Sequence, residues 1–249
     1  SIGIQSFQKK YQTLLGRSSV DYSAISAALT KVPFETVSFD FIFALPGQTI
    51  SDLICDVDLA FQLGANHVAL YPFIDFSFTK SDVQAMKNPD KRKLLNEITA
   101  YLKKNGCTRT SIWTFSNEKE ACYSSMTREN FLGFGCSATT LLNGQFKINT
   151  FSPEAYGNRI SHGRLPTSLT LKFSKRQRMV YYLFWTAYST WVDPKEFQLF
   201  FGDKLSSWYG AELWLAQRLG WLEKKDGKYH LTLNGVFAYH YFESFYTLK

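Results

Sequence analysis

The stretch from residue 37 to residue 74 restricts the possible folds more than any other part of the chain. Apolar runs cover Val37–Leu45 and His67–Ile74, and Pro46-Gly47 ends the first of them. Between the runs, apolar residues recur at helical spacing from Ile50 to Leu63. Strand, amphipathic helix and strand at this spacing predict one βαβ unit with parallel strands and a right-handed crossover.

Asp40 is the one charged residue inside the first of these runs. A strand of a parallel sheet is buried on both faces, and an unpaired charge in such a place is costly. The carboxylate is therefore either hydrogen-bonded within the fold or turned toward a ligand, and the pattern alone leaves both readings open.

Strand–helix alternation continues through the first 150 residues. It predicts strands at Ser1–Phe7 and Thr108–Phe115, and helices at Tyr22–Lys31 and from Asn88 to Gly106. Such alternation is typical of α/β folds, in which ligands gather at the carboxyl ends of the strands. Three candidate site residues fall near strand ends of this kind: Gln5, Asp40 and Ile74.

From about residue 151 the alternation stops, and helices rich in aromatic residues follow. Trp221–Leu233 predicts a hairpin with the type I′ turn signal Asp226-Gly227, and a last helix starts at Asn234. We therefore expect two domains, residues 1–150 and residues 151–249, the second mostly helical and resembling a winged helix. The helix before the hairpin offers only Gln217 and Arg218 to a nucleic acid, so the pattern favours a packing module over DNA binding.

The cysteines and histidines predict no metal site within the chain. Four cysteines are widely spaced, without a C-x-x-C pair or a close trio that could bind an iron–sulfur cluster or zinc: Cys55, Cys107, Cys122 and Cys136. The four histidines also lack metal-ligand spacing. Reduced cysteines are typical of a cytoplasmic protein, and no apolar run approaches the roughly 20 residues that cross a bilayer.

Three stretches, taken in order, resemble one known family. FDFIFALPGQT at residues 39–49 is similar to the DLIYGLPxQT signature of the oxygen-independent coproporphyrinogen III oxidase-like radical SAM proteins. Ser1–Phe7 resembles the family's SIGVQSF strand, LLGR follows at residues 14–17, and Gly133–Thr139 resembles its glycine-rich loop. The resemblance implies a partial (β/α) barrel followed by a small C-terminal domain, so the fold class is α/β.

This resemblance also implies cofactors and a reaction. In the family, a [4Fe–4S] cluster reduces S-adenosylmethionine to give a radical that abstracts hydrogen from a porphyrin or haem. The implied function is oxidative decarboxylation, or methyl transfer with haem ring opening, with flavodoxin or ferredoxin as electron donor; the alternative is a haem-binding chaperone. The family's CxxxCxxC cluster motif is not in this sequence, so we expect it upstream of Ser1 and expect the chain alone to be inactive.

Motif alignment carries five cofactor-binding positions onto this chain. Gln5 and Arg17 match positions that hold the nucleotide or the methionine end of S-adenosylmethionine, and Asp40 matches a carboxylate that binds the nucleoside. Ile74 and Thr139 match positions that line the adenine site. The chain departs from the signature at Phe43 and Ala44, where the family has tyrosine and glycine.

The net charge of +7 is concentrated in one segment. Between residues 155 and 192 there are six basic residues and no acid: Arg159, Arg164, Lys172, Lys175, Arg176 and Arg178. Two interpretations stay open, a solvated helix start with a linker, or a surface that meets the propionate carboxylates of a tetrapyrrole.

Overall fold

The structure, a computed structural model, describes residues 1–18, 21–74, 84–117 and 129–247, with only the backbone for residues 243–247. The chain divides into two compact units. The first comprises residues 1–123, 215–223 and 231–249, and the second comprises residues 124–214 and 224–230.

A five-stranded sheet with the order β1-β2-β3-β5-β4 forms the centre of the first unit. Its strands are β1 (Ile2–Gln5), β2 (Ser38–Phe43), β3 (His67–Pro72), β4 (Thr108–Arg109) and β5 (Thr114–Ser116). The first three are parallel, whereas β5 is antiparallel to both β3 and β4. Helix α3 (Ile50–Gln62) connects β2 to β3, which confirms the predicted βαβ unit.

The prediction of one strand over residues 108–115 was wrong. The chain turns back between β4 and β5, because Thr110 N–H and Ser111 N–H both donate to the carbonyl of Thr114. The Ser111 hydroxyl also bonds to the Thr114 hydroxyl at 2.7 Å. Such local side-chain bonds of Ser and Thr offer the backbone a turn in place of a longer strand.

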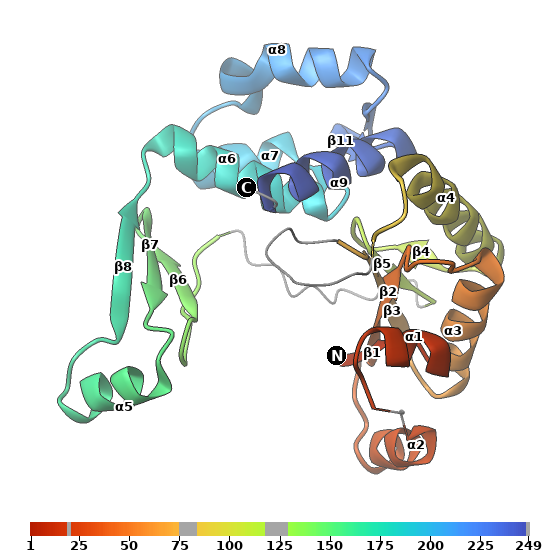
Figure 1. Cartoon of the computed structure of the whole chain (residues 1–249). Coiled ribbons are helices and arrows are strands. Elements are labelled where there is room, and N and C mark those ends of the chain that lie inside the picture. The colour runs from red at the N-terminus through yellow and green to blue at the C-terminus, as the bar shows by residue number, and fades with distance from the viewer. Residues whose placement is uncertain (19–20, 75–83, 118–128, 248–249) are drawn as a thin grey trace. The chain divides into compact units, whose positions relative to one another are not determined.

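The two faces of this sheet differ in chemistry. Side chains alternate along β2, and Phe39, Phe41 and Phe43 are almost fully buried on one face. Helix α3 contacts β2 and β3, and α4 (Asn88–Lys104) packs beside α3 (Figure 1). The other face of β2 carries Ser38, Asp40 and Ile42, so the helices cover the aromatic face and leave the polar groups on the opposite one.

Two short helices follow β1. Helix α1 covers Lys9–Leu14 and α2 covers Tyr22–Lys31. The predicted helix at residues 22–31 is confirmed, with Asp21 as its N-cap accepting from the N–H groups of Ser23 and Ala24.

The second unit contains an antiparallel sheet in the order β6-β7-β8. Its strands are β6 (Thr139–Leu142), β7 (Gln145–Asn149) and β8 (Thr167–Lys172), and α5 (Pro153–Ser161) lies between β7 and β8 in the chain. From the sequence pattern, only Lys147–Thr150 is predicted as a short strand here, and it overlaps β7. The pattern missed β8 because five of this strand's six residues are exposed, which leaves no buried stripe to detect.

Helices form the rest of the second unit. They are α6 (Lys175–Tyr188), α7 (Pro194–Phe201) and most of α8 (Leu205–Arg218). Met179, Tyr182, Phe197 and Leu205 form their shared core. Strand β9 (Trp191–Val192) pairs with β11 (Lys228–Leu231).

The predicted hairpin and last helix are present. Strands β10 (Leu222–Lys225) and β11 (Lys228–Leu231) are joined by Asp226 and Gly227, both at positive φ, which is the geometry of the predicted type I′ turn. Helix α9 (Leu233–Thr247) follows. No helix in the described ranges is long and apolar enough to span a membrane.

Candidate functional site

Three of the five predicted site residues converge on Gly3 in the first unit. Asp40 is the register partner of Gly3 on the neighbouring strand, so the carboxylate projects from the sheet face to which Gly3 contributes no side chain. The Gln5 amide nitrogen lies 2.9 Å from the point that a Cβ of Gly3 would occupy. Arg17 Nη1 donates to the Gly3 carbonyl at 3.0 Å. An amide, a carboxylate and a guanidinium therefore surround one glycine.

Gln5 reaches this position through unusual backbone geometry. It is the last residue of β1 and has a φ of 69°, in the left-handed region that is unfavourable for residues with a Cβ. The register of β1 on β2 shifts between Gly3 and Gln5, as in a β-bulge. Strained residues of this kind concentrate at functional sites, because the surrounding structure has to hold them in place.

Arg17 is brought back to β1 by the loop that follows α1. Gly16 at a φ of 65° turns the chain, and Arg17 N–H donates to the carbonyl of Gln12 at 2.8 Å. The Gln12 side chain in turn donates to the carbonyl of Ser6 at 2.9 Å. The loop is thus tied to the end of β1, although the Arg17 side chain itself is exposed.

Asp40 is half-buried among small neighbours. Its register partners are Gly3 on β1 and Ala69 on β3. The carboxylate accepts a hydrogen bond from the Ser1 hydroxyl at 2.7 Å. Asp40 is the third of six residues in β2 rather than a terminal one, so it lies on the sheet face and not at its edge. The small neighbours leave space in which the carboxylate can accept from a bound hydroxyl group.

A chain of hydrogen-bonded side chains extends the polar face beyond Asp40. The Ser38 hydroxyl lies 2.8 Å from His67 Nδ1, and His67 Nε2 lies 3.2 Å from the Thr110 hydroxyl. Thr110 and Ser111 both bond to the Thr114 hydroxyl at 2.7 Å. Burial lowers the pKa of His67, and the nearby charge of Asp40 opposes that shift.

No sequence pattern singles out these hydrogen-bonded side chains. The spacing of the histidines predicts surface or core residues rather than metal ligands, and His67 is fully buried. Ser38 could have been found, because it stands two residues before Asp40 and so shares its face of β2. Thr110 and Ser111 could not, since their position depends on the turn between β4 and β5.

The other two predicted residues are not in this group. Ile74 is half-buried and lies two residues beyond the end of β3. Thr139 is the first residue of β6 in the second unit, where its carbonyl oxygen lies only 2.1 Å from the point that a Cβ of Gly133 would occupy. The same loop is held by Asn149 Nδ2, which donates to the Gly135 carbonyl at 3.0 Å.

The donor set around Gly3 suits a hydroxylated molecule with a carboxylate, as in a nucleoside joined to an amino acid. Asp40 accepts from hydroxyls, Arg17 donates to carboxylates, and the Gln5 amide does both. S-adenosylmethionine has these groups, so the residues present fit it. An iron–sulfur cluster does not fit the described residues, because no group of three His, Cys, Asp or Glu among them could hold a metal. Cys55, Cys107 and Cys136 are free thiols, and Cys122 lies outside the described ranges.

Several curated proteins of differing names are similar to this chain. The heme chaperone HemW of Buchnera aphidicola subsp. Acyrthosiphon pisum is 25% identical over 177 residues, which are 64% of this chain and 47% of that protein. The oxygen-independent coproporphyrinogen III oxidase of Cereibacter sphaeroides is 25% identical over 189 residues, which are 67% of this chain and 42% of that protein. The chain thus spans about half the length of the curated relatives it matches. No protein-family model matches it.

A solved structure shares the fold. Coproporphyrinogen III oxidase (HemN) from Escherichia coli, described as a radical SAM enzyme, superposes with a TM-score of 0.75 over 96% of this chain and 61% of its own, at 16% sequence identity. The superposed residues therefore include both units of the chain.

Proposed function

Since the chain belongs to the oxygen-independent coproporphyrinogen III oxidase-like radical SAM family, we propose that Gln5, Arg17 and Asp40 hold S-adenosylmethionine for radical chemistry on a tetrapyrrole. In this family, S-adenosylmethionine is the source of the radical that abstracts hydrogen from the substrate. The roles assigned here to the residues of this chain are binding and orientation of that cofactor.

The observation that carries the proposal is the convergence of these three side chains on Gly3. Asp40 accepts the hydroxyl hydrogens of the ribose, for which its small neighbours leave room. Arg17 lies within hydrogen-bond reach of the Gly3 carbonyl and can pair with the carboxylate of the methionine end. The Gln5 amide lies beside Gly3 and can both donate to and accept from the same molecule. Ile74 and Thr139 remain proposed contacts of the adenine, and the cytoplasm remains the proposed location.

Binding of S-adenosylmethionine by the chain tests this site. The Asp40→Asn substitution keeps the shape of the side chain and removes its charge and half of its acceptor capacity. Hydrogen bonds to charged groups are worth roughly 1.5–3 kcal/mol, so we expect affinity to fall about tenfold or more, measured by isothermal titration calorimetry. Asp226→Asn, the same chemical change in the exposed hairpin turn, is the matched control. Equal affinities of wild type and Asp40→Asn for S-adenosylmethionine would contradict the proposed role of Asp40 in binding it.

A haem chaperone of the same family is the second candidate. The similar proteins include several named as heme chaperones, and this chain departs from the family signature at Phe43 and Ala44. To separate the two functions, haem and coproporphyrinogen are added separately to the complete gene product, with its cluster reconstituted anaerobically and with reduced flavodoxin or ferredoxin as electron donor. An enzyme gives a modified tetrapyrrole, whereas a chaperone retains haem stoichiometrically without turnover.

A further inference from the structure

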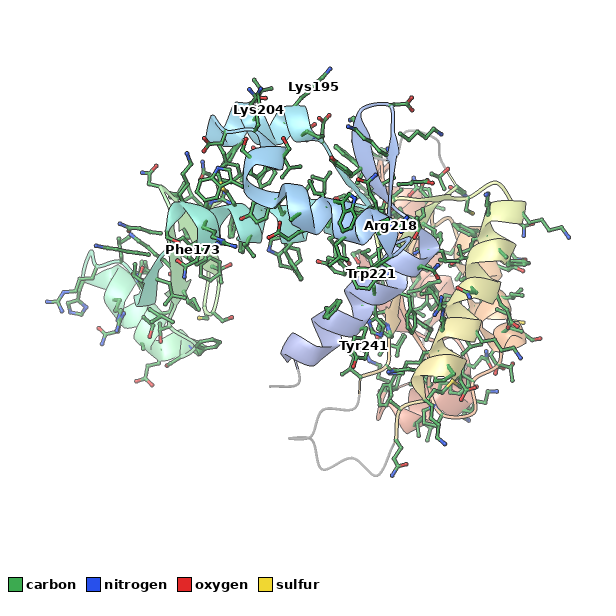
Figure 2. The ribbon with its side chains drawn as sticks, turned by 90° about the horizontal axis from the view of Figure 1, so that it is seen from above. Phe173, Lys195, Lys204, Arg218, Trp221 and Tyr241 are labelled. Carbon is green, nitrogen blue, oxygen red and sulfur yellow. The ribbon has the colours of Figure 1, made fainter. Side chains whose placement is uncertain are left out.

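A pocket separate from Gly3 lies in the first unit between α4, the chain that precedes β10, and α9. Its volume is about 490 Å³, within the ~300–1,000 Å³ range of small-molecule sites. Half of its eight lining residues are aromatic: Trp221, Phe237, Tyr241 and Phe242. Figure 2 labels two of them: Tyr241, which is on α9, and Trp221, which precedes β10. Leu219 and Ala238 add aliphatic surface, and Arg92 and Asn234 are the polar members.

Arg92 is held in place at the polar end of this pocket. Its guanidinium lies over the ring of Phe237, 5.1 Å from the ring centre, and it donates to Asn234 Oδ1. Both contacts come from α9, while Arg92 itself belongs to α4. A guanidinium fixed by stacking and by one hydrogen bond retains donors that can pair with a carboxylate in two-point geometry.

The aromatic wall of the pocket, formed by Trp221, Phe237, Tyr241 and Phe242, is preformed, because α9 approaches Trp221 closely. A Cβ on Gly235 would lie 2.0 Å from the carbonyl oxygen of Trp221, so only glycine permits this approach. Thr232 N–H donates to the same carbonyl at 3.0 Å, and the Thr232 hydroxyl donates to the carbonyl of Gly220 at 2.6 Å. The Trp221 ring then meets Phe242 edge to face, with 6.0 Å between ring centres.

This wall is apolar and open to solvent. Tyr241 is 51% exposed, Phe242 47% and Leu219 49%. Apolar surface left open in a concave site is typical of ligand binding, and aromatic faces favour flat π systems. With a single cation at one end and no acid in the lining, the ligand that fits best combines a planar apolar body with a carboxylate at its edge.

We propose that this pocket binds a planar aromatic molecule that carries carboxylates, its rings against Trp221, Tyr241 and Phe242 and one carboxylate on Arg92. The ligand class is a tetrapyrrole, an identification that rests on the proposed function. The pocket is then a surface that captures or holds the tetrapyrrole, separate from the residues around Gly3.

The test uses hemin, coproporphyrin III and the dimethyl ester of mesoporphyrin, which lacks free carboxylates, titrated into the chain with tryptophan fluorescence and porphyrin absorbance as readouts. Arg92→Glu should weaken binding of hemin and coproporphyrin at least tenfold and leave the ester unaffected. Arg92→Gln, which keeps a neutral donor, should lose less. The double variant Tyr241→Ser, Phe242→Ser should weaken all three ligands at least tenfold.

Two matched controls lie outside the pocket. Lys195→Glu reverses an exposed cation on α7, and Trp214→Ser removes an exposed indole on α8; both should bind within twofold of wild type. Circular dichroism confirms that each variant is folded.

Two outcomes would contradict the proposal that this pocket binds a tetrapyrrole. One is tetrapyrrole binding that the Arg92 and Tyr241/Phe242 variants leave unchanged, and the other is no tetrapyrrole binding by wild type. Neither outcome touches the Gly3 site, which is judged on the same preparations by the effect of Asp40→Asn on S-adenosylmethionine affinity. Failure of the two proposals can therefore be told apart.

Discussion

Asp56 is a buried carboxylate that joins α3 to the end of β1. Only 1% exposed, it accepts hydrogen bonds from the Ser6 hydroxyl at 2.7 Å and from Phe7 N–H at 2.9 Å. Burial raises the pKa of Asp56 to about 6, against the opposing effect of these two hydrogen bonds. The carboxyl group therefore holds its proton more tightly in the folded state than in the unfolded chain.

A defined pH dependence of stability follows for Asp56. Because the folded-state pKa is the higher one, this group stabilises the fold below about pH 4, and the contribution is lost as the pH rises through about 6. A rise in the pKa of Asp56 from 3.8 to about 6 corresponds to about 3 kcal/mol. Urea unfolding at pH 4.5, 5.5 and 7 should show Asp56→Asn losing this part of the pH dependence and gaining stability relative to wild type as the pH rises. Parallel profiles for the two proteins would assign the dependence to other groups.

Substitution of Gln5 by glycine can separate the effect of backbone strain on stability from the effect of the amide on ligand binding. Gln5→Gly relieves a left-handed φ, worth roughly 1–2 kcal/mol, and adds about 0.5–1 kcal/mol of chain entropy to the unfolded state. The free energy of unfolding should therefore change by no more than about 1 kcal/mol. Affinity for S-adenosylmethionine should still fall, by about fivefold, because a neutral hydrogen bond is worth roughly 1 kcal/mol. Unchanged affinity in calorimetry would make the amide a purely structural group.

Three of the five residues that the sequence singled out surround Gly3, but the geometry that brings them together could not be predicted. Motif alignment selected Gln5, Arg17 and Asp40, and these three meet at Gly3. That meeting depends on a shift of register and a positive φ at the end of β1, which no periodicity reveals. The hydroxyl groups near His67 were missed because a turn between two antiparallel strands brings them there.

Among the elements, the glycine-rich loop before β6 offers a matched pair of substitutions. A Cβ on Gly133 would clash with the Thr139 backbone, with 2.1 Å to its oxygen, so Gly133→Ala should destabilise by roughly 1–3 kcal/mol. Gly157 lies inside α5 with nothing within 4 Å of its missing Cβ, so Gly157→Ala should stabilise by about 0.5–1 kcal/mol. Chemical denaturation of both variants measures the change in the free energy of unfolding, which should have opposite signs. Equal effects would show that the loop can move to admit a methyl group.

The elements that the sequence predicted best are those with a buried stripe and clear ends. Helix α3 begins at a capping box formed by Thr49 and Asp52, and α4 begins with Pro89 in its first turn, so both were bounded correctly. The strand predicted at residues 108–115 failed, because alternation persists through a turn made by Ser and Thr. Strand β8 failed because it buries almost nothing.

Three of the six cations between residues 155 and 192 have partners within their own unit. Arg159 donates to the Thr167 carbonyl at 2.6 Å, and Lys175 forms an ion pair with Asp203. Arg178 is buried beside the rings of Tyr181 and Phe200 and donates to the Glu129 carbonyl. These contacts support the structural interpretation for half of the six cations, and the exposed Arg164, Lys172 and Arg176 remain available to an acidic partner.

On the scale of the whole molecule, the first unit depends on α9, which comes from the far end of the chain. His240 is 5% exposed, its ring 4.7 Å from that of Trp113, and Val236 is 2% exposed. A fragment of residues 1–150 lacks α9 and uncovers Trp113. We expect it to be at least about 3 kcal/mol less stable than the full chain, the usual cost of losing a large aromatic contact. Thermal unfolding followed by circular dichroism measures this, and a fragment as stable as the parent would make residues 1–150 an autonomous domain.

Because Gly3 has no side chain, a substitution there can change the space in the site without changing its charges. A methyl group there would stand 2.9 Å from the Gln5 amide nitrogen, the movable end of a flexible side chain. Gly3→Ala would therefore displace the amide while every charge stays in place. Such a variant would block the site by volume and leave the protein folded. Cells that carry it would show which functions need a ligand at this site and which need only the folded protein.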